Sequence, residues 1–286
     1  MACNSWRDRI VHRWLRIPYR LSVRYKRLRR PFTTTYVLIH GLADTGALWQ
    51  PLLAQLPKQS NYIVVDLLGH GESPQPHDES IYRASEQARH VLATCVATGL
   101  SGSVVLIGHS FGALVATEFS HMYRGIVRRA VLVSPPIYRD ETGNRRDWLR
   151  QDKLLRSVYR QVLKTPDLVV AGYELGDRLG ALGFSRTQLS KSTFTGFENT
   201  LRAGIISQRT GRLLRHITIP TTIIYGRLDP LLVARNFTAL ARVNSCITVR
   251  PLSTGHAIRE RTLREIVAVI RSEEHTSELQ SRQVIS

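Results

Sequence analysis

The chain has few cysteines and no long apolar segment. Its three cysteines, Cys3, Cys95 and Cys246, lack the spacing of metal ligands, so the sequence predicts neither a disulfide framework nor a zinc site. No hydrophobic run approaches the roughly 20 residues that span a bilayer. The charged start also lacks the apolar stretch and small-residue cleavage site of a secretory signal. We therefore expect a cytoplasmic protein.

A glycine-rich dinucleotide fingerprint and a phosphate-binding loop are both missing, so we expect no cofactor and no metal. What the chain does have is length and apolar content. With 286 residues, 43% of them hydrophobic, it can bury one large core, and a single domain suffices.

Acidic residues are outnumbered, with 22 Asp and Glu against 40 Lys and Arg, which gives a net charge of +18. Residues 1–30 hold ten of the basic residues and one acid, Asp8. Residues 1–18 are predicted to form a basic amphipathic helix, because apolar residues recur there at helical spacing: Trp6, Ile10, Trp14 and Ile17.

Two interpretations of this basic segment stay open, and a third is disfavoured. Residues 1–30 could rest peripherally on an anionic membrane, at its inner surface, or the apolar stripe could pack against the rest of the protein. A basic field also attracts nucleic acid, but no known nucleic-acid module accompanies it, so nucleic-acid binding is not expected.

A serine lies at the centre of the motif Gly108-His109-Ser110-Phe111-Gly112. An apolar run precedes the motif and a helical run of small residues follows it. Glycines two positions to either side of a serine permit the tight strand-to-helix turn called a nucleophile elbow, which exposes the hydroxyl. We predict Ser110 as a nucleophile.

A serine needs a base beside it and a group that orients the base. Asp229 follows the apolar run 221–225, and His256 follows the run 246–249. Carboxyl ends of parallel strands meet at one edge of a sheet, so we predict His256 as the base and Asp229 as its orienter. Backbone N–H groups of Leu42, after the run 36–39, and of Phe111 are predicted to form an oxyanion hole.

These motifs, together with Asp66 to Ser73, resemble the α/β-hydrolase superfamily over residues 19–271, in its esterase-like branch of single-domain serine hydrolases. The resemblance implies an α/β fold with a mostly parallel central sheet, helices on both faces and a helical lid inserted after the family's sixth strand. It also implies that Asp66 and His70 shape a turn. Epoxide hydrolases and haloalkane dehalogenases of this superfamily carry aspartate at the Ser110 position, which disfavours both activities.

The pattern of apolar residues fits this fold, because strands and helices alternate. The predicted strands are 19–25, 35–39, 61–65, 103–107, 128–133, 220–225 and 246–250. The predicted helices are 46–56, 81–99, 111–123, 231–242 and 257–270. We place the hydrolase domain at 19–270.

The alternation breaks over 136–218, which we predict to be the inserted lid. Its aromatic residues could line the substrate pocket or the core of the lid, and the sequence does not assign the substrate-binding residues: Tyr138, Trp148, Phe184, Phe194 and Phe197. The alternative is an insertion that packs away from the site. Residues 271–286 are polar and lack periodicity, resemble a translated sequencing adapter, and are expected to be a non-native or disordered tail.

The predicted activity is hydrolysis of a small carboxylic ester or related acyl substrate through an acyl-enzyme on Ser110. Other activities of the same residues stay open. They could transfer the acyl group to an alcohol, amine or peroxide, or cleave a carbon–carbon bond. A homologue that senses a ligand without turnover is a further alternative.

Overall fold

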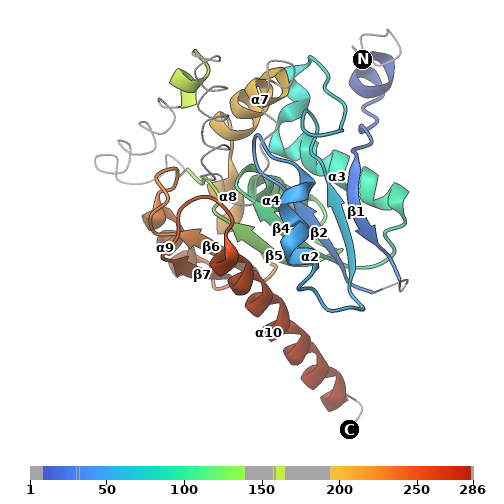
Figure 1. The fold of residues 1–286 in the computed structure, drawn as a ribbon, viewed down its shortest axis with the longest axis vertical. Helices are drawn as coiled ribbons and strands as arrows, with labels where there is room; N and C mark the ends of the chain where they lie inside the picture. Colours follow the sequence, from blue (N-terminus) through green and yellow to red (C-terminus); the bar gives the residue numbers. More distant parts are fainter. Residues whose placement is uncertain are drawn as a thin grey trace.

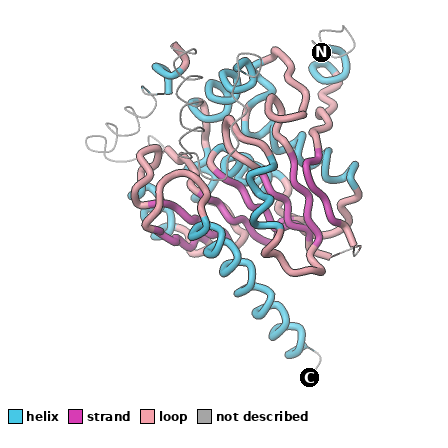
Figure 2. The backbone as a smooth tube through the Cα atoms, in the orientation of Figure 1, coloured by secondary structure: helices cyan, strands magenta, loops and turns pink. Residues whose placement is uncertain are grey.

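The computed structural model describes residues 9–29, 31, 33–138, 157, 159–164 and 194–284. Seven strands form one sheet in the order β1-β3-β2-β4-β5-β6-β7, which crosses the middle of the molecule (Figures 1 and 2). β1 is antiparallel to β3, and the other neighbours are parallel. The strands are β1 Val23–Arg27, β2 Thr35–Ile39, β3 Asn61–Val65, β4 Val104–His109, β5 Val127–Val133, β6 Thr221–Gly226 and β7 Ile247–Leu252.

The helices alternate with the strands, as the sequence predicts. They are η1 Arg9–Trp14, η2 Gly46–Trp49, α2 Gln50–Leu53, η3 Glu79–Tyr82, α3 Ala84–Thr98, α4 Phe111–Met122, α7 Phe194–Asn199, η4 Thr200–Ile206, α8 Thr210–Arg215, α9 Ala234–Val243 and α10 Glu260–Val284. The α/β-hydrolase fold with a mostly parallel sheet and flanking helices is therefore confirmed.

Two apolar clusters hold the helices on opposite faces of the sheet. Successive strand residues alternate between the faces: Val37 and Ile39 of β2 join the cluster with α3 and α4, whereas Leu38 joins the cluster with Trp49 and α10. β4 lies at the centre of the sheet, and all six of its residues are buried. The carboxyl end of β4 is therefore a rigid base for the residues that follow it.

The first strand begins later than the predicted 19–25. Backbone amides before β1 pair with side chains of α3 instead of a neighbouring strand: Tyr19 N–H donates to His90 Nδ1 (3.1 Å) and Leu21 N–H to Thr94 Oγ1 (2.9 Å). Burial of Tyr19 and Leu21 gives the apolar pattern of a strand. Helix α3 takes the hydrogen bonds that a strand would have made.

The last helix runs beyond the predicted 257–270. α10 continues to Val284, and its second half projects from the body of the protein (Figure 1). The stretch 271–284, which we expected to lack regular structure, contains neither glycine nor proline. Its residues therefore offer no stop signal to a helix already started by the buried residues Leu263 and Ile266.

Residues 9–14 of the predicted amphipathic segment form the short helix η1, and residues 1–8 lie outside the described part. The apolar side chains are exposed, with Trp14 at 81% and Ile17 at 48%. Trp14 therefore does not pack against the body, and Trp6, the first residue of the predicted apolar stripe, lies outside the described residues. Among the described helices, none is both long enough and apolar enough to cross a bilayer.

The predicted insertion 136–218 starts after β5, and the structure describes its beginning, a short helical piece near 157–164, and its return. Helices α7, η4 and α8 form the return, and Arg209 before α8 makes two hydrogen bonds to the buried carboxylate of Glu118 in α4 (3.0 and 3.1 Å). Trp148 and Phe184 lie outside the described residues. Tyr138 and Phe197 are buried and belong to the apolar core.

Candidate active site

Ser110 occupies a strained turn between β4 and α4. Its φ of 51° and ψ of −118° are rare for a residue with a side chain. Its N–H donates to the carbonyl of Val133 (2.8 Å). The flanking glycines are needed for close packing, because a Cβ on Gly108 would lie 2.4 Å from the Gly112 carbonyl oxygen, and one on Gly112 would lie 2.3 Å from that of Ile39.

The structure brings Ser110, His256 and Asp229 together in a chain of hydrogen bonds. The Ser110 hydroxyl lies 3.0 Å from His256 Nε2, and His256 Nδ1 lies 2.6 Å from Asp229 Oδ2. The Asp229 side chain is fully buried, and its other oxygen accepts the N–H of Leu231 (3.0 Å). An Nδ1–H that donates to the carboxylate leaves Nε2 free to accept the serine proton.

The loops that carry Asp229 and His256 are bonded to each other. Leu228 N–H donates to the Thr254 carbonyl (3.1 Å), and a Cβ on Gly226 would lie 2.2 Å from the same oxygen. Parallel strands β6 and β7 bring both loops to one edge of the sheet. The separation between imidazole and carboxylate is therefore fixed by backbone contacts.

The loop after β2 approaches the serine from the other side. A Cβ on Gly41 would lie 3.0 Å from the Cβ of Ser110, so the backbone just before Leu42 lies against the serine. Phe111 is the first residue of α4, so its N–H has no acceptor within that helix. Ala43 has a φ of 57°, a strained value that keeps this loop tightly folded.

His40 holds this loop in place. Its Nδ1–H donates to the carbonyl of Gly41 (2.7 Å), and its Nε2 accepts the N–H of Leu67 (2.8 Å). Complete burial lowers the pKa of His40 to about 4, so the ring stays neutral at pH 7. Both nitrogens are occupied by backbone groups, which leaves His40 unable to act as a base.

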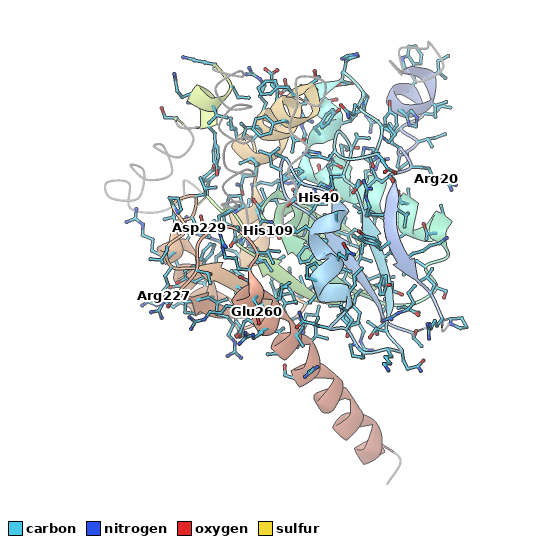
Figure 3. All side chains as sticks on the ribbon, in the orientation of Figure 1. Arg20, His40, His109, Arg227, Asp229 and Glu260 are labelled. Carbon is cyan, nitrogen blue, oxygen red and sulfur yellow. The ribbon has the colours of Figure 1, made fainter. Side chains whose placement is uncertain are left out.

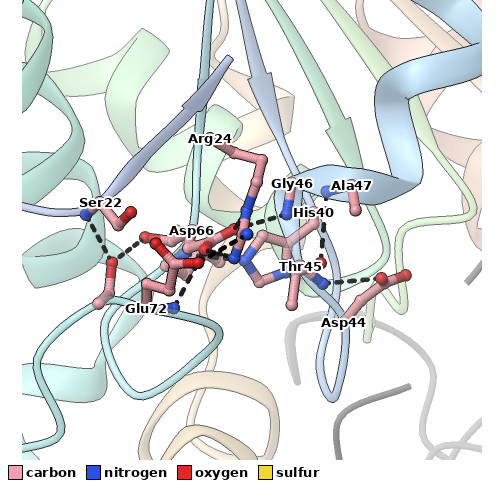
Figure 4. Close-up of polar contacts among 11 residues, drawn as sticks. Ser22, Arg24, His40, Asp44, Thr45, Gly46, Ala47, Asp66 and Glu72 are labelled. Atoms are coloured by element: carbon pink, nitrogen blue, oxygen red, sulfur yellow. Dashed lines mark hydrogen bonds and ion pairs between the residues drawn. The ribbon is translucent and has the colours of Figure 1, made fainter. Parts of the chain in front are cut away.

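Asp66 is the hub of a second network beside the loop (Figure 4). Its carboxylate accepts hydrogen bonds from Arg24 Nη2 (2.5 Å), Gly46 N–H (2.7 Å) and Glu72 N–H (3.1 Å). Burial by itself raises the pKa of Asp66, but the hydrogen bonds from Arg24 and Gly46 outweigh it and leave the pKa below its usual range. Asp66 therefore fixes two turns, which agrees with the role that the family resemblance implies.

Sequence reasoning missed the contact that His109 makes with the loop of the base. Figure 3 labels His109 among the side chains at the centre of the molecule. His109 Nε2–H donates to the backbone carbonyl of His256 (3.0 Å), and burial lowers the pKa of His109 to about 3. The only signal in the sequence is an imidazole directly before the serine, and nothing there points to residue 256.

The described residues contain no group of three His, Cys, Asp or Glu side chains that could hold a metal ion. The side chains that meet at the site are a hydroxyl, an imidazole and a carboxylate. Such a set of groups is suited to nucleophilic acyl transfer.

Residues 36–269 match the alpha/beta hydrolase family. An uncharacterized protein of Mycobacterium tuberculosis is 28% identical over 218 residues, which cover 70% of this chain and 63% of that relative. A pimeloyl-[acyl-carrier protein] methyl ester esterase of Pseudoalteromonas atlantica is 28% identical over 68% of this chain and 76% of its own length. The chain thus spans less than two thirds of the mycobacterial relative.

Solved structures share the fold. The enol-lactonase from Burkholderia xenovorans superposes with a TM-score of 0.66 at 19% identity, over 88% of this chain and 95% of its own. An esterase from Exiguobacterium antarcticum gives a TM-score of 0.66 at 17% identity, over 85% of this chain and 92% of its own. At these identities the likeness concerns the fold alone.

Proposed function

We propose that this chain, which belongs to the alpha/beta hydrolase family, hydrolyses carboxylic esters through an acyl-enzyme on Ser110. One observation carries the proposal: the hydrogen bonds that run from the Ser110 hydroxyl through His256 to Asp229. The pimeloyl-[acyl-carrier protein] methyl ester esterase among the relatives supports an ester as the substrate class.

In the first step His256 Nε2 takes the proton of Ser110, and the serine oxygen attacks the ester carbonyl carbon. The negative charge that forms on the carbonyl oxygen is stabilised by the N–H groups of Leu42 and Phe111, each worth about 3 kcal/mol in such a site. His256 then gives the proton to the departing alcohol. Asp229 holds the imidazole in the required tautomer and stabilises its positive form.

In the second step a water molecule loses a proton to His256 Nε2 and attacks the acyl carbon. The bond to the serine oxygen breaks, the carboxylic acid leaves, and the proton returns to Ser110. No cofactor enters either step.

Hydrolysis of para-nitrophenyl esters of graded chain length tests the proposal. Ser110→Ala should lower kcat by about 10⁴-fold or more, and Asp229→Asn should lower it by about 10⁴-fold because the wrong tautomer then forms. Ser120→Ala is the matched control, since Ser120 is buried in α4 and its hydroxyl donates to the carbonyl of Ala116 (2.7 Å) within the same helix. Hydrolysis at the wild-type rate by folded Ser110→Ala would overturn the assignment.

The same reaction with a competing nucleophile separates hydrolysis from acyl transfer. A fluorophosphonate probe, mapped by mass spectrometry, should modify Ser110 in the wild-type protein. Ester formation with added methanol in place of acid release would favour the acyltransferase. Single labelling by the probe without multiple turnover on any ester would favour the ligand sensor.

A further inference from the structure

Apolar side chains gather on the surface of the described residues just before β1. Eight large hydrophobic side chains are exposed in the described part of the chain, and four of them lie within residues 10–17: Ile10 at 41%, Trp14 at 81%, Leu15 at 63% and Ile17 at 48%. Exposed apolar side chains that cluster in this way mark a contact surface, whereas isolated ones do not. We call Ile10, Trp14, Leu15 and Ile17 the amino-terminal apolar cluster.

The protein body holds this segment in one orientation. The ring of His12 stacks on Tyr19 with 3.5 Å between centroids, and its Nδ1–H donates to the carbonyl of Ile17 (2.6 Å). Arg89 of α3 donates from Nη2 to the carbonyl of Arg16 (2.9 Å). These contacts hold the segment in place while the side chains of the apolar cluster stay exposed to solvent.

Positive charge surrounds the cluster. Arg16 and Arg20 are both exposed, and Figure 3 shows Arg20 at the periphery of the molecule. Arg24, by contrast, is engaged with Asp66 and Glu72 of the protein itself. An exposed tryptophan beside arginines suits the boundary between lipid headgroups and acyl chains, where an indole ring and a cation are both stabilised.

The topology places this segment at the edge of the sheet that carries Ser110. β1 is antiparallel to β3, and its first residue, Val23, pairs with Val65 at the end of β3. The chain therefore enters the sheet at the carboxyl edge of the parallel strands, where β4 ends just before Ser110. Figure 1 shows η1 and α7 at the same end of the molecule, opposite the free end of α10.

We propose that the amino-terminal apolar cluster, with Arg16 and Arg20, docks the protein on an anionic membrane surface. The inference goes beyond ester hydrolysis and does not depend on it. Docked in this way, the protein turns the sheet edge that carries Ser110 toward the bilayer and the second half of α10 away from the bilayer.

Vesicle flotation tests the proposal with the full chain. Wild-type protein should float with vesicles of phosphatidylcholine and phosphatidylglycerol at 7:3, and its partition coefficient should fall at least tenfold with phosphatidylcholine alone. Raising the salt from 0.1 to 0.5 M should also weaken binding, because the charges of the exposed arginines are screened. Equal binding to neutral and anionic vesicles, or to neither, would overturn the proposal.

Variants locate the surface. Combined replacement of Trp14, Leu15 and Ile17 by Ser should reduce partitioning at least tenfold, and Arg16→Gln with Arg20→Gln should reduce it only on anionic vesicles. The matched control is Val96→Ser with Val243→Ser, since Val96 and Val243 are exposed by 59% and 67% on other elements. The control should bind like wild type.

Two further measurements keep the outcome clear. Circular dichroism should show the same melting curve for each variant, because the replaced side chains bury little surface. Binding of a 20-nucleotide RNA is measured alongside. RNA binding that depends on Trp14, together with no binding to anionic vesicles, would identify a nucleic-acid surface and refute membrane docking.

Discussion

Four buried histidines make the stability of this protein sensitive to mild acid. His40, His70, His90 and His109 are each at most 6% exposed, and burial lowers their pKa values to about 4, 3, 4 and 3. Well above pH 6.5 these rings are neutral in both the folded and the unfolded chain, so they do not make stability depend on pH. As the pH falls through 6.5, the unfolded chain binds protons that the folded protein excludes, and stability falls until the folded pKa is reached.

The size of the effect follows from these pKa values. At pH 5, each buried histidine costs ~2 kcal/mol relative to pH 7, because the unfolded ring titrates near pH 6.5. Four such rings cost ~8 kcal/mol, which is comparable to the whole free energy of unfolding of a typical domain, ~5–15 kcal/mol. Near pH 5 the free energy of unfolding should fall by ~5 kcal/mol per pH unit.

Urea unfolding followed by circular dichroism between pH 7.5 and 5 measures this slope. His70→Asn removes one titrating group and keeps an N–H for the carbonyl of Leu68, which His70 Nδ1–H now contacts at 3.1 Å. Its slope should be smaller by ~1.4 kcal/mol per pH unit, whatever its stability at pH 7. His77→Asn is the control, since His77 is exposed. Stability that stays constant from pH 7 to 5 would refute the reasoning.

Two further changes test the packing around the serine. His109→Phe should lower kcat for para-nitrophenyl acetate by about 10²-fold, because a small displacement of His256 misaligns the base. His109→Gln keeps a hydrogen-bond donor and should recover most of the activity. Equal kcat values in both variants would contradict this role of His109. Gly112→Ala should destabilise the protein by about 3 kcal/mol in urea unfolding, since its Cβ would lie 2.3 Å from the carbonyl oxygen of Ile39. Gly125→Ala, with nothing within 4 Å of the added carbon, should leave stability nearly unchanged, and an equal loss in both variants would show that the contact at Gly112 does not matter.

Strand positions and the motifs at the site could be predicted from short stretches of the sequence. Buried parallel strands are continuous apolar runs, so β2 and β3 are placed at the predicted residues 35–39 and 61–65. Glycine spacing around Ser110 reflects contacts within a few residues, and the predicted order of Ser110, Asp229 and His256 identified three side chains that the fold brings into contact.

Contacts between distant residues that no motif marks could not be predicted in this way. Tyr19 and Leu21 look like strand residues, yet their amides bond to α3 side chains 71 and 73 positions away. The contact between His109 and His256 spans 147 positions. Side-chain exposure of Trp14 likewise depends on which surfaces lie nearby, and the periodicity of the segment alone left packing and membrane contact as alternatives.

The bonding between the loops of Asp229 and His256 limits how this site can be switched off. The loop of His256 is tied to the loop of Asp229 and, through the His256 carbonyl, to His109 beside the serine. The imidazole therefore cannot move away from either partner without breaking a hydrogen bond to the backbone. Control of this site would act on access to the serine and not on the spacing of its three groups.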